Sequence, residues 1–65
     1  MIRFTTAYYG LTRAGQWVAT LVQEWVNPEN GSRGHSEDDR IPCPDEATAK
    51  AKAYAMGADS VRCLA

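Results

Sequence analysis

The side chains best suited to chemistry lie between residues 29 and 46. Six carboxylates occur there: Glu29, Glu37, Asp38, Asp39, Asp45 and Glu46. His35 lies among them, and an imidazole near carboxylates is a pairing that general acid–base catalysis uses. The spacing opposes this use, because Glu37 to Asp39 are consecutive and open to water, whereas catalytic carboxylates are held apart by a rigid scaffold. His35 also has no nucleophile fixed beside it. We therefore predict that the chain is not an enzyme and has no catalytic residues.

The potential metal ligands do not form a recognisable site. A structural zinc ion needs four ligands, and Cys43, Cys63 and His35 supply three at no known spacing. Two cysteines are too few to define a disulfide scaffold, and we expect both to be buried thiols that pack as small apolar groups. The sequence also lacks a glycine-rich phosphate loop and a nucleotide fingerprint. We expect no metal and no cofactor.

The charge distribution points to a protein partner. The net charge is −1, but residues 27–46 carry six acids against two arginines, a local balance of −4. Such a block is either a solvated loop or a negative surface for a basic partner. The seven basic residues are scattered, and the acidic block would repel phosphate, so we expect no direct binding of nucleic acid.

Length and composition are those of one small folded domain spanning residues 1–65. The chain is 45% apolar and 23% charged, which is ordinary for a globular protein. No apolar run approaches the roughly 18 residues that a membrane span requires, and the N-terminus lacks the pattern of a secretory signal. We expect a cytoplasmic protein without membrane contact, with a monomer favoured over an oligomer.

The C-terminal third carries the clearest helix signal. Pro44 suits the first helical position, and two carboxylates follow it where the helix dipole is positive. Gly57 suits the left-handed residue that ends many helices. These signals predict an alanine-rich helix from about Pro44 to Met56, with Cys43 as a weak N-cap.

A helical wheel divides this helix into two faces. One face holds Ala47, Ala51, Tyr54, Ala55 and Ala58, and the opposite face holds Ala49, Ala53 and Met56. We predict that the first face packs on a sheet. Because alanines let a helix approach a sheet closely, large side chains must fill the gap, and we assign Phe4, Trp17 and Leu21 to this role.

Strand signals occupy the rest of the chain. Residues 2–9 alternate β-branched and aromatic side chains and predict a strand, and residues 10–15, bounded by glycines, predict a hairpin connection. Residues 16–26 are ambiguous, because their apolar spacing fits a helix whereas their tryptophans, valines and threonines favour a strand. We assign a strand there, with a helix as the alternative. Ser60 to Leu64 predicts a short last strand.

The strand over residues 16–26 would have two different faces. Trp17, Ala19, Leu21, Gln23 and Trp25 would face the helix, and Val18, Thr20, Val22, Glu24 and Val26 would point the other way. Val18, Val22 and Val26 would then form an apolar stripe. We interpret this stripe as a second contact surface, for a target or for another copy of the chain.

The polar middle of the chain connects the hairpin to the helix. Asn30-Gly31 is a strong turn signal. Residues 32–40 form either a mobile loop or an exposed edge strand whose charges discourage edge-to-edge association. The predicted fold is α+β, a small antiparallel sheet of order β-β-(β)-α-β with one alanine-rich helix packed on one face.

In size and style the whole chain resembles small phage and mobile-element proteins, among them anti-CRISPR inhibitors of type I systems. The resemblance lies in a short, slightly acidic chain with a β-hairpin and one alanine-rich helix, from Pro44-Asp45-Glu46-Ala47 through Gly57-Ala58-Asp59-Ser60-Val61. It implies a stoichiometric inhibitor in the host cytoplasm that binds a type I CRISPR surveillance complex. The six carboxylates would occupy basic residues that otherwise hold DNA. The alternative is a structural or regulatory interaction module, with a homodimer through the valine stripe.

Overall fold

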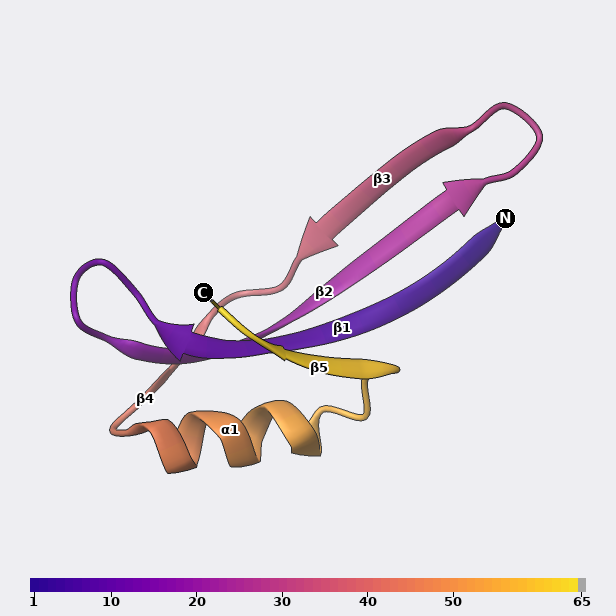
Figure 1. The fold of residues 1–65 in the computed structure, drawn as a ribbon. Coiled ribbons are helices and arrows are strands. Elements are labelled where there is room, and N and C mark those ends of the chain that lie inside the picture. The colour runs from indigo at the N-terminus through magenta and orange to yellow at the C-terminus, as the bar shows by residue number, and fades with distance from the viewer. Residues whose placement is uncertain (65) are drawn as a thin grey trace.

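The computed structural model describes residues 1–64 as a five-stranded mixed sheet with one helix, which confirms the α+β class (Figure 1). The elements are β1 (Ile2–Leu11), β2 (Trp17–Asn27), β3 (Ser32–Glu37), β4 (Ile41–Cys43), α1 (Glu46–Ala55) and β5 (Ser60–Cys63). The strand order is β3-β2-β1-β5, and β4 also pairs with β2.

A long antiparallel hairpin of β1 and β2 forms the centre of the sheet. Its register runs from the pair Ile2 and Val26 to the pair Leu11 and Trp17. The strand assignment for the ambiguous segment is therefore confirmed, because its aromatic and β-branched side chains gain a cross-strand partner at every position. The connection turns at Gly15, whose φ of 82° favours glycine.

The strands β3 and β4 lie along the same side of β2, one after the other. β3 pairs with Val22 to Asn27, and β4 pairs with Trp17 to Ala19. The turn between β2 and β3 ends at Gly31, whose φ of 71° agrees with the predicted Asn-Gly turn. Of the two alternatives for the polar segment, the structure has the edge strand.

The direction of β5 corrects the prediction of a purely antiparallel sheet. β5 runs parallel to β1, with Ala7 facing Val61 and Tyr9 facing Cys63. The reason is the helix, which carries the chain back beneath the sheet, so β5 runs in the same direction as β4. Because β4 is antiparallel to β2, and β2 is antiparallel to β1, β5 must be parallel to β1.

The helix begins later than the sequence suggested. The N-cap is Asp45, not Cys43, and its carboxylate accepts a hydrogen bond from the Thr48 N–H at 2.8 Å. A carboxylate is a far better cap than a thiol, which explains the shift. At the other end, Met56 caps the helix and Gly57 follows with a φ of 71°, as predicted.

The helix packs through the face opposite to the predicted one. Ala49 and Ala53 are fully buried, whereas Tyr54 is 62% exposed and Ala47, Ala51 and Ala55 are exposed. The alanines surround the helix, so only Tyr54 and Met56 could orient it, and Met56 is the one that packs against the core. Ala58, which follows the helix, also packs there.

The core lies between the helix and the near half of the hairpin. It consists of Ala7, Ala19, Cys43, Ala49 and Ala53, with Tyr9, Trp17, Leu21, Met56, Ala58 and Val61 packed around them. Trp17 and Leu21 pack between the sheet and the helix, as predicted. Phe4 does not: it is 38% exposed and lies opposite Glu24, on the sheet face away from the helix. Of the two thiols, Cys43 is buried as predicted and Cys63 is exposed.

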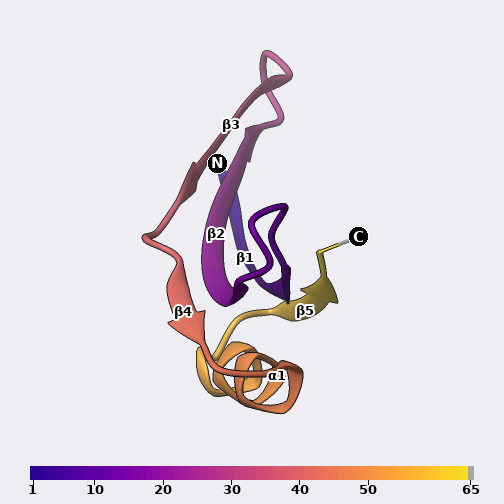
Figure 2. The ribbon, with the colours of Figure 1, turned by 90° about the vertical axis from the view of Figure 1, so that its left-hand side faces the viewer.

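The molecule is elongated, with principal extents of 43, 23 and 18 Å. The helix underlies one end of the sheet, and the N-terminal part of β1, the end of β2 and β3 extend beyond it (Figures 1 and 2). These three strands form a single layer at the far end, so side chains on both of its faces are available for contacts.

Candidate functional site

The most concentrated negative charge lies where β3 passes into β4. Glu37 ends β3, and Asp38 and Asp39 follow it; we name these three residues the acidic connection. All three are exposed. Arg40 offsets part of the charge, since its Nε lies 2.9 Å from Oε1 of Glu37. Residues 38–40 connect β3 to β4 beside β2, so the carboxylates lie at the rim of the sheet.

The backbone of the acidic connection is held by β2. The Asp38 N–H donates to the Leu21 carbonyl at 2.9 Å, and the Thr20 hydroxyl donates to the Asp38 carbonyl at 3.0 Å. Thr20 is only 1% exposed, so its hydroxyl is fixed inside the sheet. Both hydrogen bonds hold the backbone of Asp38, so its carboxylate projects from an anchored residue, which lowers the entropic cost of binding a partner.

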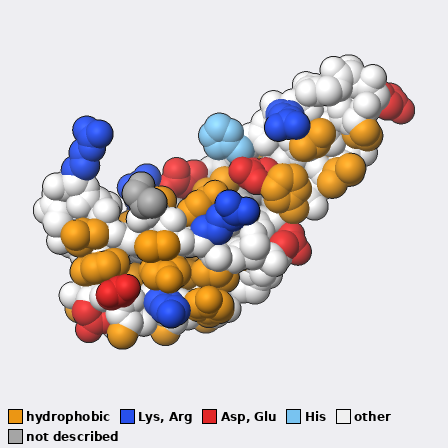
Figure 3. All heavy atoms as spheres, in the orientation of Figure 1, with side chains coloured by type: hydrophobic (Ala, Val, Ile, Leu, Met, Phe, Trp, Pro, Cys, Tyr) orange, Lys and Arg blue, Asp and Glu red, His pale blue; other side chains and the backbone are white. Residues whose placement is uncertain are grey.

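The other three predicted carboxylates lie at the two ends of this side of the sheet. Asp45 and Glu46 begin the helix, whereas Glu29 lies in the turn between β2 and β3. Figure 1 shows that turn and the start of the helix at opposite ends of the molecule. The six acids therefore do not gather into one patch, and Figure 3 shows acidic side chains as separate spots on the face that it draws.

The environment of Asp45 differs from that of the other acids. Hydrogen bonds from the side chain and the backbone N–H of Thr48 lower the pKa of the Asp45 carboxyl. This carboxylate therefore stabilises the helix start, and it is less free to bind a partner than Asp38 or Asp39. Glu46 follows in the first helical turn and is exposed.

The valine stripe is not the exposed surface that the sequence suggested. Val18 is 5% exposed, and Val22 and Val26 are half-buried. Val18 faces Gly10 across the hairpin, and Leu64 lies so close to Gly10 that a Cβ there would be 2.5 Å from the Leu64 Cβ. The C-terminal segment therefore lies beside this part of the sheet, where Val18 is buried, whereas Val22 and Val26 remain partly accessible.

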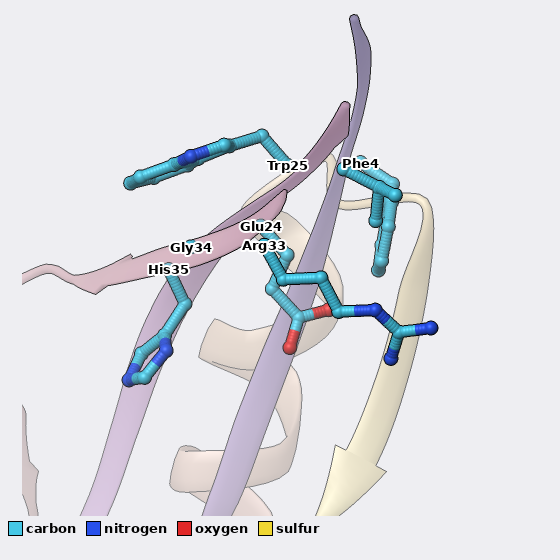
Figure 4. Close-up of a pocket in the computed structure, with 7 residues that line it drawn as sticks. Phe4, Glu24, Trp25, Arg33, Gly34 and His35 are labelled. Atoms are coloured by element: carbon cyan, nitrogen blue, oxygen red, sulfur yellow. The ribbon is translucent and has the colours of Figure 1, made fainter. Parts of the chain in front are cut away.

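A shallow pocket at the far end was not foreseen from the sequence. Its volume is about 240 Å³, and it is lined by Phe4, Glu24, Trp25, Val26, Arg33, Gly34 and His35. Figure 4 shows Phe4, Glu24, Arg33 and His35 on one side of the sheet and the Trp25 ring on the other. The lining offers an imidazole, a carboxylate and a guanidinium but no hydroxyl or thiol. Glu24 pairs with His35 across β2 and β3, which brings the carboxylate and the imidazole together. This pairing can be known only from the register of the two strands.

Residues 1–64 contain neither a cluster of potential metal ligands nor a membrane-spanning helix. Among residues 1–64, no three His, Cys, Asp or Glu side chains come together as a metal site would require. The helix in this part has neither the length nor the apolar character to cross a membrane.

Comparison of the chain with protein-family models, with curated proteins and with solved structures found no match. The functional assignment therefore rests on the arrangement of the side chains.

Proposed function

We propose that this chain is a non-enzymatic binding protein whose acidic connection docks on a basic protein surface. The observation that supports this most directly is the fixed backbone beneath exposed carboxylates at the rim of β2, with Thr20 and Leu21 as its anchors. A surface of this kind presents negative charge without having to order a loop when a partner binds.

The partner that we propose is a DNA-binding subunit of a type I CRISPR surveillance complex. Arginine recognises carboxylates and phosphates in the same bidentate way, so carboxylates on a rigid rim can occupy a groove that otherwise holds DNA. Binding would then block recognition of the target DNA. The chain would act stoichiometrically, because nothing in this mechanism requires turnover.

The test divides the six carboxylates into two matched halves. One variant carries Glu37→Gln, Asp38→Asn and Asp39→Asn, and the control carries Glu29→Gln, Asp45→Asn and Glu46→Gln. Each removes three negative charges. We expect the first variant to lose binding to a purified type I surveillance complex and to lose inhibition of its DNA binding, whereas the control keeps most of both.

Salt dependence provides a second measurement. Binding steered by charge should slow as ionic strength rises, mainly through the association rate. The variant that lacks the acidic connection should show a much weaker salt dependence. If this variant binds the complex and blocks DNA as the unmodified chain does, the charge mechanism is wrong.

A further inference from the structure

The outer side of β3 is an open edge of the sheet. In the order β3-β2-β1-β5, β3 has a neighbour on one side only within residues 1–64. The opposite side of the sheet is better closed: β5 pairs with Thr6 to Tyr9, and the next residue, Thr5, donates its N–H to Asp59 at 2.8 Å. An unprotected edge strand is a template for pairing with another strand.

The hydrogen bonds of β3 identify the groups that face outward. The Asp38 N–H points to β2, where it donates to Leu21. In an antiparallel ladder, alternate residues point to the same neighbour, so Ser36 and Gly34 also point to β2. Arg33, His35 and Glu37 must then direct their N–H and C=O groups away from the sheet. Their side chains share one face, because they are two residues apart.

We propose that two copies of this chain pair through β3 in antiparallel fashion, with His35 of each copy facing His35 of the other. In this register Arg33 of each copy faces Glu37 of the other copy. All three outward-pointing residues then form hydrogen-bonded pairs, each of which exchanges two N–H···O bonds. The result is one continuous sheet across both copies, related by a two-fold axis.

The charge pattern of β3 favours this register, and it favours a second copy of the chain as the partner. A positive residue, a central histidine and a negative residue at intervals of two are self-complementary under a two-fold rotation. Sliding one copy by two residues in one direction leaves His35 opposite Arg33 and removes both charge pairs. Sliding it in the other direction leaves His35 opposite Glu37 and sets Arg33 against Asp39, which lies beyond the end of β3 and outside the ladder. Asp38 and Asp39 would face Ser32 and Gly31 of the second copy, which are uncharged. The charges that were expected to discourage edge pairing therefore support it in one register.

The ion pair between Glu37 and Arg40 does not prevent this association. Both side chains are exposed, and an exposed pair of this type contributes little to stability, so Glu37 can exchange Arg40 for Arg33 of the second copy at small cost. The edge also lacks the usual protection, since β3 contains no proline and no lysine. This inference does not depend on the proposed function, because it concerns the purified chain alone.

The experiment measures mass by light scattering on a sizing column over a wide range of protein concentrations. The unmodified chain should double its mass as concentration rises. Arg33→Glu and Glu37→Arg each place two pairs of like charges across the interface, so each variant alone should dimerise roughly tenfold or more weakly. The control is Lys52→Glu, an exposed charge reversal on α1, which should dimerise as the unmodified chain does.

Mixing the two single variants tests the register itself. The Arg33→Glu chain carries an acid at both positions, and the Glu37→Arg chain carries an arginine at both. A mixed dimer therefore restores opposite charges in both cross-strand pairs, so an equimolar mixture of the two chains should regain the mass of a dimer. A third variant, His35→Pro, removes an outward N–H while leaving the ladder to β2, and it should stay monomeric. Circular dichroism confirms that each variant is folded.

Several outcomes would overturn the proposal. A chain that stays monomeric at every concentration has no β3 interface. Dimers that persist unchanged in Arg33→Glu or His35→Pro use another surface, such as the far end of the valine stripe. A mixture of the two charge variants that stays monomeric would exclude the proposed register.

Discussion

The indole of Trp25 occupies the space in which a side chain at position 34 would lie. Trp25 and Gly34 face each other across β2 and β3, and a Cβ built on Gly34 would overlap the Cε2 and Cζ2 atoms of the indole. A glycine in a strand interior usually weakens the strand, because it packs nothing and has a flexible backbone. Here the cross-strand tryptophan covers the glycine, so the pair acts as one packing unit at the end of the sheet that has no helix beneath it.

This relationship predicts that Gly34→Ala destabilises the far end of the sheet. The new methyl group must displace the indole, and overpacking of this kind costs about 1–3 kcal/mol. We expect a lower midpoint in urea and a shifted NMR resonance of the Trp25 indole N–H. Ser36→Ala is the matched control, because Ser36 lies two residues along β3 on the same face and is exposed. An unmoved indole resonance in Gly34→Ala would contradict the packing described here.

The close approach of helix and sheet gives a second prediction. Ala49 and Ala53 are fully buried against the core, whereas Ala51 is exposed on the far side of the same helix. Ala53→Leu should therefore overpack the interface and lower the free energy of unfolding by about 1–3 kcal/mol. Ala51→Leu, measured by the same urea titration, should change it little. If the two variants unfold at the same midpoint, the helix does not pack through Ala49 and Ala53.

The helix shows where sequence reasoning succeeds and where it stops. Its existence, its end just before Gly57 and the face of β2 that it covers were all predictable, because each depends on local residue types and spacing. Its rotation was not, because alanines on every side leave the apolar face undefined. The identity of the N-cap was not predictable either. Pro44 suggested an earlier helix start, whereas in the structure the Asp45 carboxylate accepts a hydrogen bond from the Thr48 N–H.

Some features of the candidate site were also predictable from the sequence, and others were not. The acidic residues and the exposed edge strand could be found in the sequence. The anchors of the acidic connection could not, because Thr20 and Leu21 reach Asp38 only through the register of β2 and β3. The burial of Val18 also depends on its sheet neighbours Gly10 and Pro42, which lie on two other strands and which no local pattern shows.

A third prediction concerns the hydroxyl of Thr20. Thr20→Val keeps the shape of the side chain but removes the donor to the Asp38 carbonyl, so we expect a loss of about 0.5–1.5 kcal/mol in the free energy of unfolding. The acidic connection should also become more mobile, which hydrogen exchange at residues 38–40 can measure. Thr48→Val is the comparison, because it removes a hydroxyl that bonds to Asp45 at the helix start and should therefore leave exchange at residues 38–40 unchanged. Unchanged exchange at residues 38–40 would show that the hydroxyl does not anchor them.

The last prediction follows from the lowered pKa of Asp45, which results from hydrogen bonds with the side chain and the backbone N–H of Thr48. The folded state binds the proton at this carboxyl more weakly than the unfolded state does, so the cap stabilises the fold fully above the ordinary aspartate value of about 3.9. This stabilisation disappears as the pH falls through the lowered folded value. Asn is also a good N-cap but does not titrate, so Asp45→Asn should retain the helix and lose this part of the pH dependence. Urea midpoints measured from about pH 6 to pH 2 should therefore fall more steeply for the unmodified chain than for Asp45→Asn. Parallel curves would mean that the ionisation of Asp45 contributes nothing to stability.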